Sequence, residues 1–297
     1  MSTQDPLLEV KNLHKHFGSI RALDGMDIRV NHGEIMSLVG DNGAGKSTLI
    51  KCINHVLAPD VGRVLVNGTD VGSLTRNDVA KIMGYVAQKD SESYSATVFD
   101  TVLMGRKPYI NWRPSSKDLE TVSAILEKLD LTDLSLRDVN NLSGGQQQKV
   151  MVGRALAQDP TLLLLDEPTS DLDIRHQLEV MDVIREEVDG GLAAVLAIHD
   201  LNLAARYCDT VAMLKDGGVY TTGRAEDVFT SENIEAVFRV TASTQLHNGR
   251  RVIIPEEPSS DGTETTGTGS TEPSASAGSD PSEATDSTAE TSTTDTD

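Results

Sequence analysis

Apolar residues recur along this chain at the spacings typical of strands and of helices. Short apolar runs predict strands at 7–10, 26–30, 34–39, 64–66, 162–166, 193–198 and 210–214. Three- and four-residue spacing and flanking signals predict helices at 46–53, 98–104, 116–129, 146–156, 174–188, 201–207, 225–229 and 232–238. Two hairpins are predicted, one at Gly217-Gly218 and one over 244–254 with its turn at Asn248-Gly249. The pattern predicts an α/β fold with a mostly helical segment from about 95 to 156.

Negative charge is concentrated at the C-terminal end of the chain. The formal net charge is −20 over 297 residues, and from Glu256 onward there are 11 acidic residues and no basic ones. This stretch is rich in Ser, Thr, Gly and Pro, so it cannot bury enough apolar surface to offset the entropy cost of ordering. We therefore expect a folded domain over 1–255 and an acidic disordered tail over 256–297. The acidic body argues against nucleic-acid binding, which favours a basic stripe.

Membrane-spanning and secretory segments are not predicted. No apolar run approaches the ~20 residues that a membrane-spanning helix needs. The first residues, MSTQDPLLEVKNL, lack the apolar core of a secretory signal. The sequence therefore predicts an intracellular, soluble protein that would reach a membrane only through partners.

The string GDNGAGKST at 40–48 satisfies the phosphate-loop pattern G-x-x-x-x-G-K-[ST]. It lies between a predicted strand and a predicted helix, which is the order that phosphate binding requires. Backbone N–H groups would surround the phosphates, Lys46 would add a full charge, and Ser47 would offer its hydroxyl to Mg²⁺. The residues expected to bind nucleotide here are Gly40, Asn42, Gly43, Ala44, Gly45, Lys46, Ser47 and Thr48. The alternative, an ordinary Gly-rich turn, is disfavoured by the flanking pattern.

An acidic pair follows the four leucines at 162–165. The leucines predict a strand buried on both faces, and ligands of open α/β sheets bind at the carboxyl ends of such strands. Asp166 would hold Mg²⁺ directly or through water, and Glu167 would orient and polarise the attacking water. Taken alone, such a junction is more often structural, but after a phosphate loop the functional interpretation is the better one.

The string LSGGQ at 142–146 extends this nucleotide site into a family pattern. Ser143 lies 23 residues before Asp166, and this order and spacing, with the phosphate loop, resemble the nucleotide-binding subunit of ATP-binding cassette (ABC) transporters. The resemblance covers roughly residues 5 to 255. It implies a P-loop NTPase fold with a RecA-like core, an antiparallel β subdomain and an inserted helical subdomain at about 95–156.

The resemblance also implies how ATP is bound and cleaved. Two copies would face each other head to tail, each giving its signature turn to the nucleotide that the other holds. The turn residues that would contact this ATP are Ser143, Gly144, Gly145 and Gln146. The residues assigned to catalysis are Lys46, Gln88, Glu167 and His199, and those assigned to Mg²⁺ are Ser47, Gln88 and Asp166.

Three residues and one segment match family elements, but each also has an ordinary structural explanation. Gln88 matches the glutamine that senses Mg²⁺ and water, and a solvated surface glutamine is its alternative. His199 matches the switch histidine near the γ-phosphate, whereas a lone histidine at a strand end is usually structural. Phe17, 29 residues before Lys46, matches the aromatic residue that stacks on adenine, with core packing as its alternative. The segment 170–173 matches the D-loop at the dimer interface, and its alternative is a helix N-cap by Asp173.

Three departures from the family pattern stand out. Phe17 replaces the usual tyrosine, and stacking should survive because it needs only the ring face. Asp171 places a negative charge where a small residue is usual. Gln147 and Lys149 stand where arginines are frequent, which leaves open the salt bridges that brace that helix.

Longer strings sharpen the resemblance toward importers of ferric siderophores, haem and cobalamin. These strings are LMGRKPY at 103–109, LDIRHQ at 172–177 and HDLNLAARYCD at 199–209. The implied function is ATP hydrolysis that drives uptake, and the implied partners are a second copy, polytopic permease subunits and, indirectly, a substrate-binding protein. The implied location is the cytoplasmic face of the cell membrane.

Two other functions are weighed against the importer. A soluble ABC ATPase that acts on ribosomes or DNA usually carries two cassettes or a long coiled-coil insertion, and this chain has neither. A module that binds nucleotide without cleaving it is disfavoured by the intact Glu167 and His199. The identity of the cargo is not encoded in the motifs, because the cargo would contact other subunits.

Overall fold

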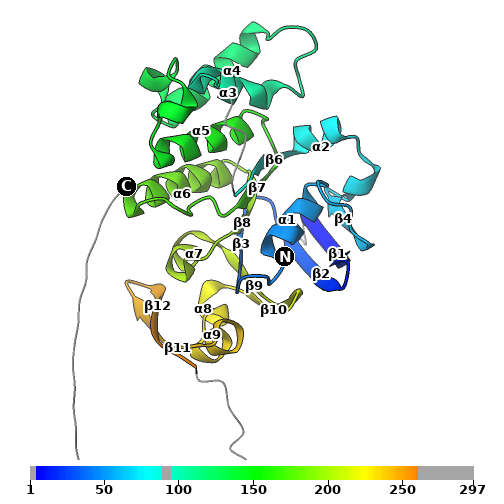
Figure 1. Cartoon of the computed structure of the whole chain (residues 1–297), viewed down its shortest axis with the longest axis vertical. Helices are drawn as coiled ribbons and strands as arrows, with labels where there is room; N and C mark the ends of the chain where they lie inside the picture. Colours follow the sequence, from blue (N-terminus) through cyan, green and yellow to red (C-terminus); the bar gives the residue numbers. More distant parts are fainter. Residues whose placement is uncertain (1–4, 89–94, 260–297) are drawn as a thin grey trace, which may run out of the picture. The chain divides into compact units, whose positions relative to one another are not determined.

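The computed structural model describes residues 5–88 and 95–259, and it begins with a small antiparallel sheet (Figure 1). The strand order of this sheet is β2-β1-β4-β5. The strands are β1 (Leu8–Phe17), β2 (Ile20–Val30), β4 (Val61–Val66) and β5 (Thr69–Asp70). Gly18, with a φ of 60°, makes the tight turn between the first two strands possible. Leu23, Met26 and Val30 are fully buried, so one face of the sheet packs against the rest of the protein.

The second sheet has six strands in the order β10-β9-β3-β8-β7-β6. Neighbouring strands from β9 to β6 are parallel, whereas β10 runs antiparallel to β9. The strands are β3 (Ile35–Gly40), β6 (Met83–Val86), β7 (Leu162–Asp166), β8 (Ala193–Ala197), β9 (Thr210–Lys215) and β10 (Gly218–Gly223). Every residue of β3, β7 and β8 is buried, as expected for parallel strands covered on both faces.

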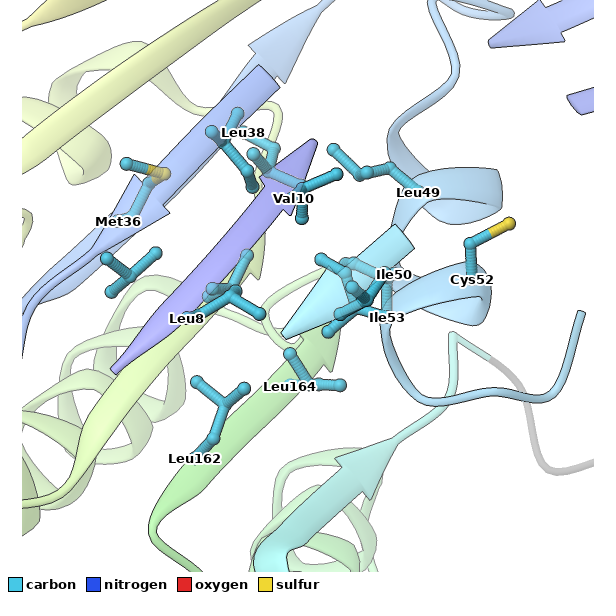
Figure 2. Packing of buried hydrophobic residues seen from close by; sticks show 14 of the residues in the cluster. Leu8, Val10, Met36, Leu38, Leu49, Ile50, Cys52, Ile53, Leu162 and Leu164 are labelled. Carbon is cyan, nitrogen blue, oxygen red and sulfur yellow. The ribbon is translucent and has the colours of Figure 1, made fainter. Parts of the chain in front are cut away.

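Helix α1 (Lys46–Ile53) lies between the two sheets. Figure 2 shows Leu49 and Ile53 of this helix among apolar side chains of β1, β3 and β7, including Leu8, Leu38 and Leu164. All five side chains are fully buried. Because each such side chain contributes about 1.5–3 kcal/mol by burial, the position of α1 is firmly set. Its N-terminus is thereby held at the carboxyl end of β3.

The other face of the six-stranded sheet packs against a second apolar cluster. Helices that contribute to it include α6 (Ile174–Asp189), α7 (Leu201–Tyr207), α8 (Ala225–Val228) and α9 (Ser231–Phe238). Met181 and Ile184 of α6 are fully buried, and so is Phe229, which follows α8. The apolar stripe of α6 therefore fixes this helix under the sheet.

The part of the chain between β5 and β7 is mainly helical. Its helices are α2 (Arg76–Ile82), α3 (Val98–Leu103), α4 (Ser116–Lys128) and α5 (Gly144–Leu156). Val98, Val122 and Val150 belong to a third apolar cluster that joins α3, α4 and α5. A nearly buried ion pair reinforces it, because Arg106 Nε lies 2.9 Å from Asp118 Oδ1. None of the helices within 5–88 and 95–259 is both long and apolar enough to cross a bilayer.

The last described element is a hairpin of β11 (Val240–His247) and β12 (Arg250–Pro258). Asn248 and Gly249 have φ values of 51° and 76°, which suits the tight turn between the strands. Asn202 of α7 fastens the hairpin, since its Nδ2 donates to the Ile253 carbonyl (3.1 Å) and its Oδ1 accepts from the Ile253 N–H (2.8 Å).

The predicted fold class is confirmed, and most predicted elements are present with shifted ends. The strands of the first sheet are longer than predicted, because β1 and β2 continue through half-exposed polar positions that form no apolar run. Three short elements, α2, β5 and β6, were not predicted. Helix α5 begins at Gly144 rather than at 146, because Ser143 forms an N-terminal cap. Strand β12 reaches Pro258, and residues 260–297 of the predicted tail lie outside the described residues.

Candidate functional site

The loop between β3 and α1 has the backbone that a phosphate ligand needs. Gly43 has a φ of 84°, and a β-carbon added there would meet nothing within 4 Å. Gly45 has a φ of 101°, and a β-carbon there would come within 2.6 Å of the Ala22 carbonyl oxygen. As the N-cap of α1, Gly45 provides no side-chain hydrogen bond, so the partial positive charge of the helix N-terminus is available to an anion. The remaining predicted loop residues are Gly40 at the end of β3, Asn42 and Ala44 in the loop, and Thr48 in the first turn of α1.

Lys46 is nearly buried, and its ammonium lies over this loop. Its Nζ donates to the carbonyl oxygens of Gly40 (2.7 Å) and Asp41 (3.1 Å). Burial lowers the pKa of Lys46, while the nearby carboxylates of Glu167, Asp41 and Asp166 favour the charged form. Among the described residues, the hydrogen-bond acceptors of Lys46 are neutral carbonyls of its own loop, and a buried cation of this kind fits an anionic ligand.

Ser47 and Asp166 meet at the carboxyl ends of β3 and β7. The Ser47 hydroxyl donates to Asp166 Oδ1 at 2.8 Å, and the Asp166 side chain is almost completely buried. Burial raises the pKa of Asp166, and the bond from Ser47 opposes this shift. A hydroxyl and a carboxylate are hard oxygen ligands of the kind that Mg²⁺ prefers, and a cation would relieve the cost of the buried charge. The pair therefore fits the predicted metal.

Glu167 gathers two more predicted residues around its carboxylate. Its φ is 56°, a left-handed conformation that is uncommon for a residue other than glycine. Gln88 Nε2 donates to Oε2 at 2.5 Å, and His199 Nε2 lies 2.7 Å from Oε1. The Glu167 N–H donates to the Ala197 carbonyl of β8 at 3.1 Å, which fixes the backbone. The carboxylate is thus oriented from both sides and can accept a proton from a neighbouring water.

The LSGGQ turn lies at the start of α5. Ser143 is the N-cap of this helix, with its hydroxyl accepting from the Gln146 N–H (3.3 Å) and its own N–H donating to Gln146 Oε1 (3.1 Å). Ser143 and Gly144 are exposed, and a β-carbon on Gly144 would meet nothing within 4 Å. The turn therefore presents an open helix N-terminus to the solvent.

The structure does not join this turn to the phosphate loop of the same chain. Within the described part of the chain, no hydrogen bond or ion pair links 143–146 with 40–48. Phe17 also lies apart from the carboxylates, at the end of β1, with 47% of its surface exposed. Lys15 Nζ lies 5.7 Å from the centre of the Phe17 ring. An exposed ring is not a core residue, and its exposed part is accessible for stacking.

Two contacts near the site, both between α5 and α6, escaped sequence analysis, whereas a third was anticipated. Lys149 braces α5 after all, because its Nζ forms an ion pair with Glu179 Oε2 on α6 at 2.8 Å. Asp173 caps α6 through the His176 N–H at 2.9 Å, as the bland alternative for this segment predicts. His176 also packs against Gly145. The string LDIRHQ contained the signal for the cap, whereas the two contacts across the helices depend on packing alone.

The chain is similar to known proteins over most of its length. The family described as ABC transporter matches residues 23–170. An uncharacterised ABC transporter ATP-binding protein of Methanocaldococcus jannaschii is 45% identical over 84% of this chain and 98% of its own length. A cobalamin import ATP-binding protein of Halobacterium salinarum is 38% identical over 84% of this chain, but the match spans only 63% of that protein. A petrobactin import ATP-binding protein of Bacillus anthracis is 36% identical over 84% of this chain and 93% of its own length.

Two solved structures are informative neighbours. A metal-chelate type ABC transporter in an inward-facing conformation has a TM-score of 0.75 at 28% identity, covering 85% of this chain and 98% of that chain. An ATP-binding cassette dimer in a post-hydrolysis state, bound to ADP and Pi, has a TM-score of 0.66 at 28% identity. That match covers 73% of this chain and 98% of the cassette. The fold, the nucleotide site and the comparisons thus point to the same kind of molecule.

Proposed function

Because the chain belongs to the ABC transporter family, we propose that it is the ATP-hydrolysing subunit of an importer for an iron chelate, haem or cobalamin. The proposal depends mainly on one observation, the carboxylate of Glu167 held between Gln88 and His199 at the edge that carries the phosphate loop. The relatives named for cobalamin and petrobactin import support the choice of cargo class.

ATP binding would use the loop and the exposed ring at the end of β1. The adenine would stack on Phe17, whose ring is accessible. The phosphates would lie on the loop N–H groups and the N-terminus of α1. Lys46 uses two of its three ammonium donors on loop carbonyls, which leaves one for a phosphate oxygen.

Mg²⁺ would be held by Ser47, Asp166 and Gln88. The first two already share a hydrogen bond, and Gln88 contacts the neighbouring Glu167. A bound Mg²⁺ would supply charge neutralisation at the β- and γ-phosphates. The burial of Asp166 supports this assignment, since an ionised carboxylate is costly there without a cation.

Hydrolysis would begin at Glu167, which would accept a proton from the attacking water. His199 would orient this carboxylate and lie close to the γ-phosphate, while Gln88 fixes its second oxygen. Lys46 would stabilise the charge that develops on the phosphoryl oxygens. Catalysis of this kind is mostly positioning and electrostatics, which suits a site whose groups are held in place by neighbouring residues.

The active form would be a head-to-tail dimer. Ser143 and Gly144 of the signature turn at 143–146 are exposed, and the turn is separate from the loop of its own chain, so it is available to the nucleotide of a partner copy. ATP would then be held from both sides, and hydrolysis would remove the shared anion and let the dimer open. The similarity to a dimeric cassette with ADP and Pi supports this arrangement.

The permease would contact the chain beside Gln88. A groove of about 490 Å³ lies along β6, the strand before Gln88, lined by residues of α2, β6, α5 and the segments after α1 and α3, among them Met83, Tyr85 and Met104. Its half-apolar lining fits a short helix of a membrane subunit. Attachment through the permease would place the protein at the cytoplasmic face of the membrane, with a substrate-binding protein as an indirect partner.

Glu167→Gln tests the proposed function. The variant should bind ATP, form a stable dimer with Mg·ATP and release phosphate about 10²–10⁴ times more slowly than the unchanged chain. Phosphate release and light scattering measure both effects. Lys46→Ala is the matched variant, which should lose both binding and dimerisation. If Glu167→Gln hydrolysed ATP at the parent rate, the role given to Glu167 would be wrong.

A further inference from the structure

The first turn of α5 and the first turn of α6 are in unusually close contact. A β-carbon built on Gly145 would lie 2.3 Å from both Cγ and Cδ2 of the His176 ring, far inside any tolerated distance. Gly144, one residue earlier, has open space at the same position. The glycine at 145 is therefore required by this imidazole. The two helices lie next to each other in Figure 1.

The ring of His176 is held in a single orientation. Its Nδ1 lies 2.8 Å from Asp173 Oδ1, and the same oxygen accepts from the His176 N–H at 2.9 Å. The hydrogen bond from the backbone N–H of His176 makes the largest contribution to lowering the pKa of Asp173. This carboxylate is therefore ionised and acts as an acceptor. The proton of a neutral His176 ring therefore lies on Nδ1, and the Cγ and Cδ2 atoms of the ring lie against Gly145.

Asp173 belongs to a segment that starts at the catalytic carboxylate. The carbonyl of Glu167 accepts from the Ser170 N–H (3.3 Å) and from the Ser170 hydroxyl (3.0 Å). Gln177 of α6 donates from Nε2 to the Thr169 carbonyl at 3.2 Å. The segment 167–173 is thus a closed turn, fastened to α6 at its far end.

We propose that His176 is a positioning residue that ties the signature turn at 143–146 to the segment 167–173 of the same chain. Since that turn serves the partner's nucleotide in the dimer proposed above, a change at one Glu167 would reach the other ATP site through Asp173, His176 and Gly145. The inference rests on the proposed function, and it adds a route by which the two sites act together.

The rest of α5 is fastened independently of this contact. Lys149, one turn further along, pairs with Glu179 at 2.8 Å, and Arg175 also pairs with Glu179. Removal of the imidazole should therefore release the signature turn without detaching the helix. Lys149→Met gives a matched control, because it removes an α5–α6 contact but leaves the contact between His176 and Gly145.

A double-mutant cycle on the full chain tests the contact. Gly145→Ala should lower ATP turnover about tenfold or more, and adding His176→Ala should recover most of that loss, because contacting residues are non-additive. The added methyl group of Gly144→Ala does not clash with His176, so His176→Ala should not restore the turnover of that variant. His176→Asn keeps an N–H donor for Asp173 in a smaller side chain and should rescue Gly145→Ala as well. A Gly145→Ala defect that persists in both double variants would overturn the proposal.

Cooperativity between the sites gives a second readout that simple destabilisation would not move. In the unchanged chain and in Lys149→Met, turnover should rise with ATP at the same Hill coefficient, while His176→Ala should lower that coefficient toward 1. His176→Asn should keep it, which also covers the case that the alanine variant folds poorly. An unaltered coefficient in His176→Ala, with normal turnover, would refute the route. The dimer formed by Glu167→Gln tests the proposed function separately, so the two failures can be told apart.

Discussion

Two buried aspartates show how differently this protein treats a structural and a functional carboxylate. Asp118 in α4 is 5% exposed, and Asp166 at the end of β7 is 1% exposed. Asp118 accepts three hydrogen bonds, two from Ser115 and one from Arg106. Asp166 accepts one from Ser47, and within the described residues no basic side chain forms an ion pair with it.

The pKa values of the two carboxyl groups move in opposite directions. The hydrogen bonds from Ser115, and then the one from Arg106, lower the pKa of Asp118 to about 2. Burial raises the pKa of Asp166 above its usual value. The negative charge of Asp118 is compensated within the fold by its hydrogen bonds and by Arg106. The negative charge of Asp166 is not compensated in this way, so a bound cation would stabilise it. The contrast supports the proposal that Asp166 holds a cation, and it does so without reference to any motif.

The largest expected effect is on turnover. Asp166→Asn should lower Mg-dependent ATP hydrolysis about 10³-fold, because the neutral amide is a poor ligand for Mg²⁺ and loses its charge beside the phosphates. Phosphate release at saturating Mg·ATP measures this. Asp118→Asn is the matched control and should retain turnover at a temperature where it is folded. A tenfold loss or less in Asp166→Asn would count against the metal assignment.

The next effect is on thermal stability. Arg106→Met leaves Asp118 without its buried cation, and the midpoint of unfolding should fall by about 10 °C. Differential scanning calorimetry measures the change. The double variant Arg106→Met/Asp118→Leu should regain most of the loss, because an apolar pair removes the uncompensated charge. If the double variant were no more stable than the single one, packing rather than charge would explain the defect.

The dependence of stability on pH should reveal the direction in which the pKa of Asp118 is shifted. The folded pKa of Asp118 lies below its unfolded value of 3.8, so its stabilisation is present above about pH 4 and is lost as the pH falls through about 2. Asp118→Asn should therefore be less stable than the unchanged chain at pH 5 and approach it near pH 2. Unfolding followed by circular dichroism across this range measures the difference. A difference that did not narrow in acid would contradict the assignment.

The smallest effect has the opposite sign. Because the folded pKa of Asp166 is raised, its protonated form stabilises the fold below the unfolded pKa of 3.8, and that stability is lost as the pH rises through the folded pKa. Asp166→Asn should therefore melt a few degrees higher than the unchanged chain at pH 7 without nucleotide or Mg²⁺. The gain should vanish below about pH 4. Lower melting of the variant at pH 7 would contradict the electrostatic argument.

Short sequence motifs predict much of the candidate site. The phosphate loop, the leucine strand and LSGGQ each combine special residue types at fixed spacing, so Lys46, Ser47 and Asp166 could be placed together in advance. The convergence of Gln88 and His199 on Glu167 could be expected only from the family resemblance. Their catalytic roles remain predictions that the variants above test.

Other features could not be predicted because they depend on packing between distant segments. β6 is a strand of four residues that contains Gly84, so its pattern is too short to distinguish from a loop. The pair Arg106–Asp118 forms only because the 3-10 turn after α3 faces the start of α4. The replacement of a frequent arginine by Lys149 left its salt bridge open, and α6 brings Glu179 within reach. The requirement for Gly145 likewise becomes visible only with His176 beside it.

The amide clamp between Asn202 and Ile253 has a consequence for the order of synthesis. The two residues are 51 positions apart, so the helix that follows His199 cannot gain these bonds until the final hairpin has been translated. The residues of the phosphate loop, by contrast, are translated early, although β3 gains its neighbours β8 and β9 only later. The helix after His199 is therefore the last part of the site to be braced.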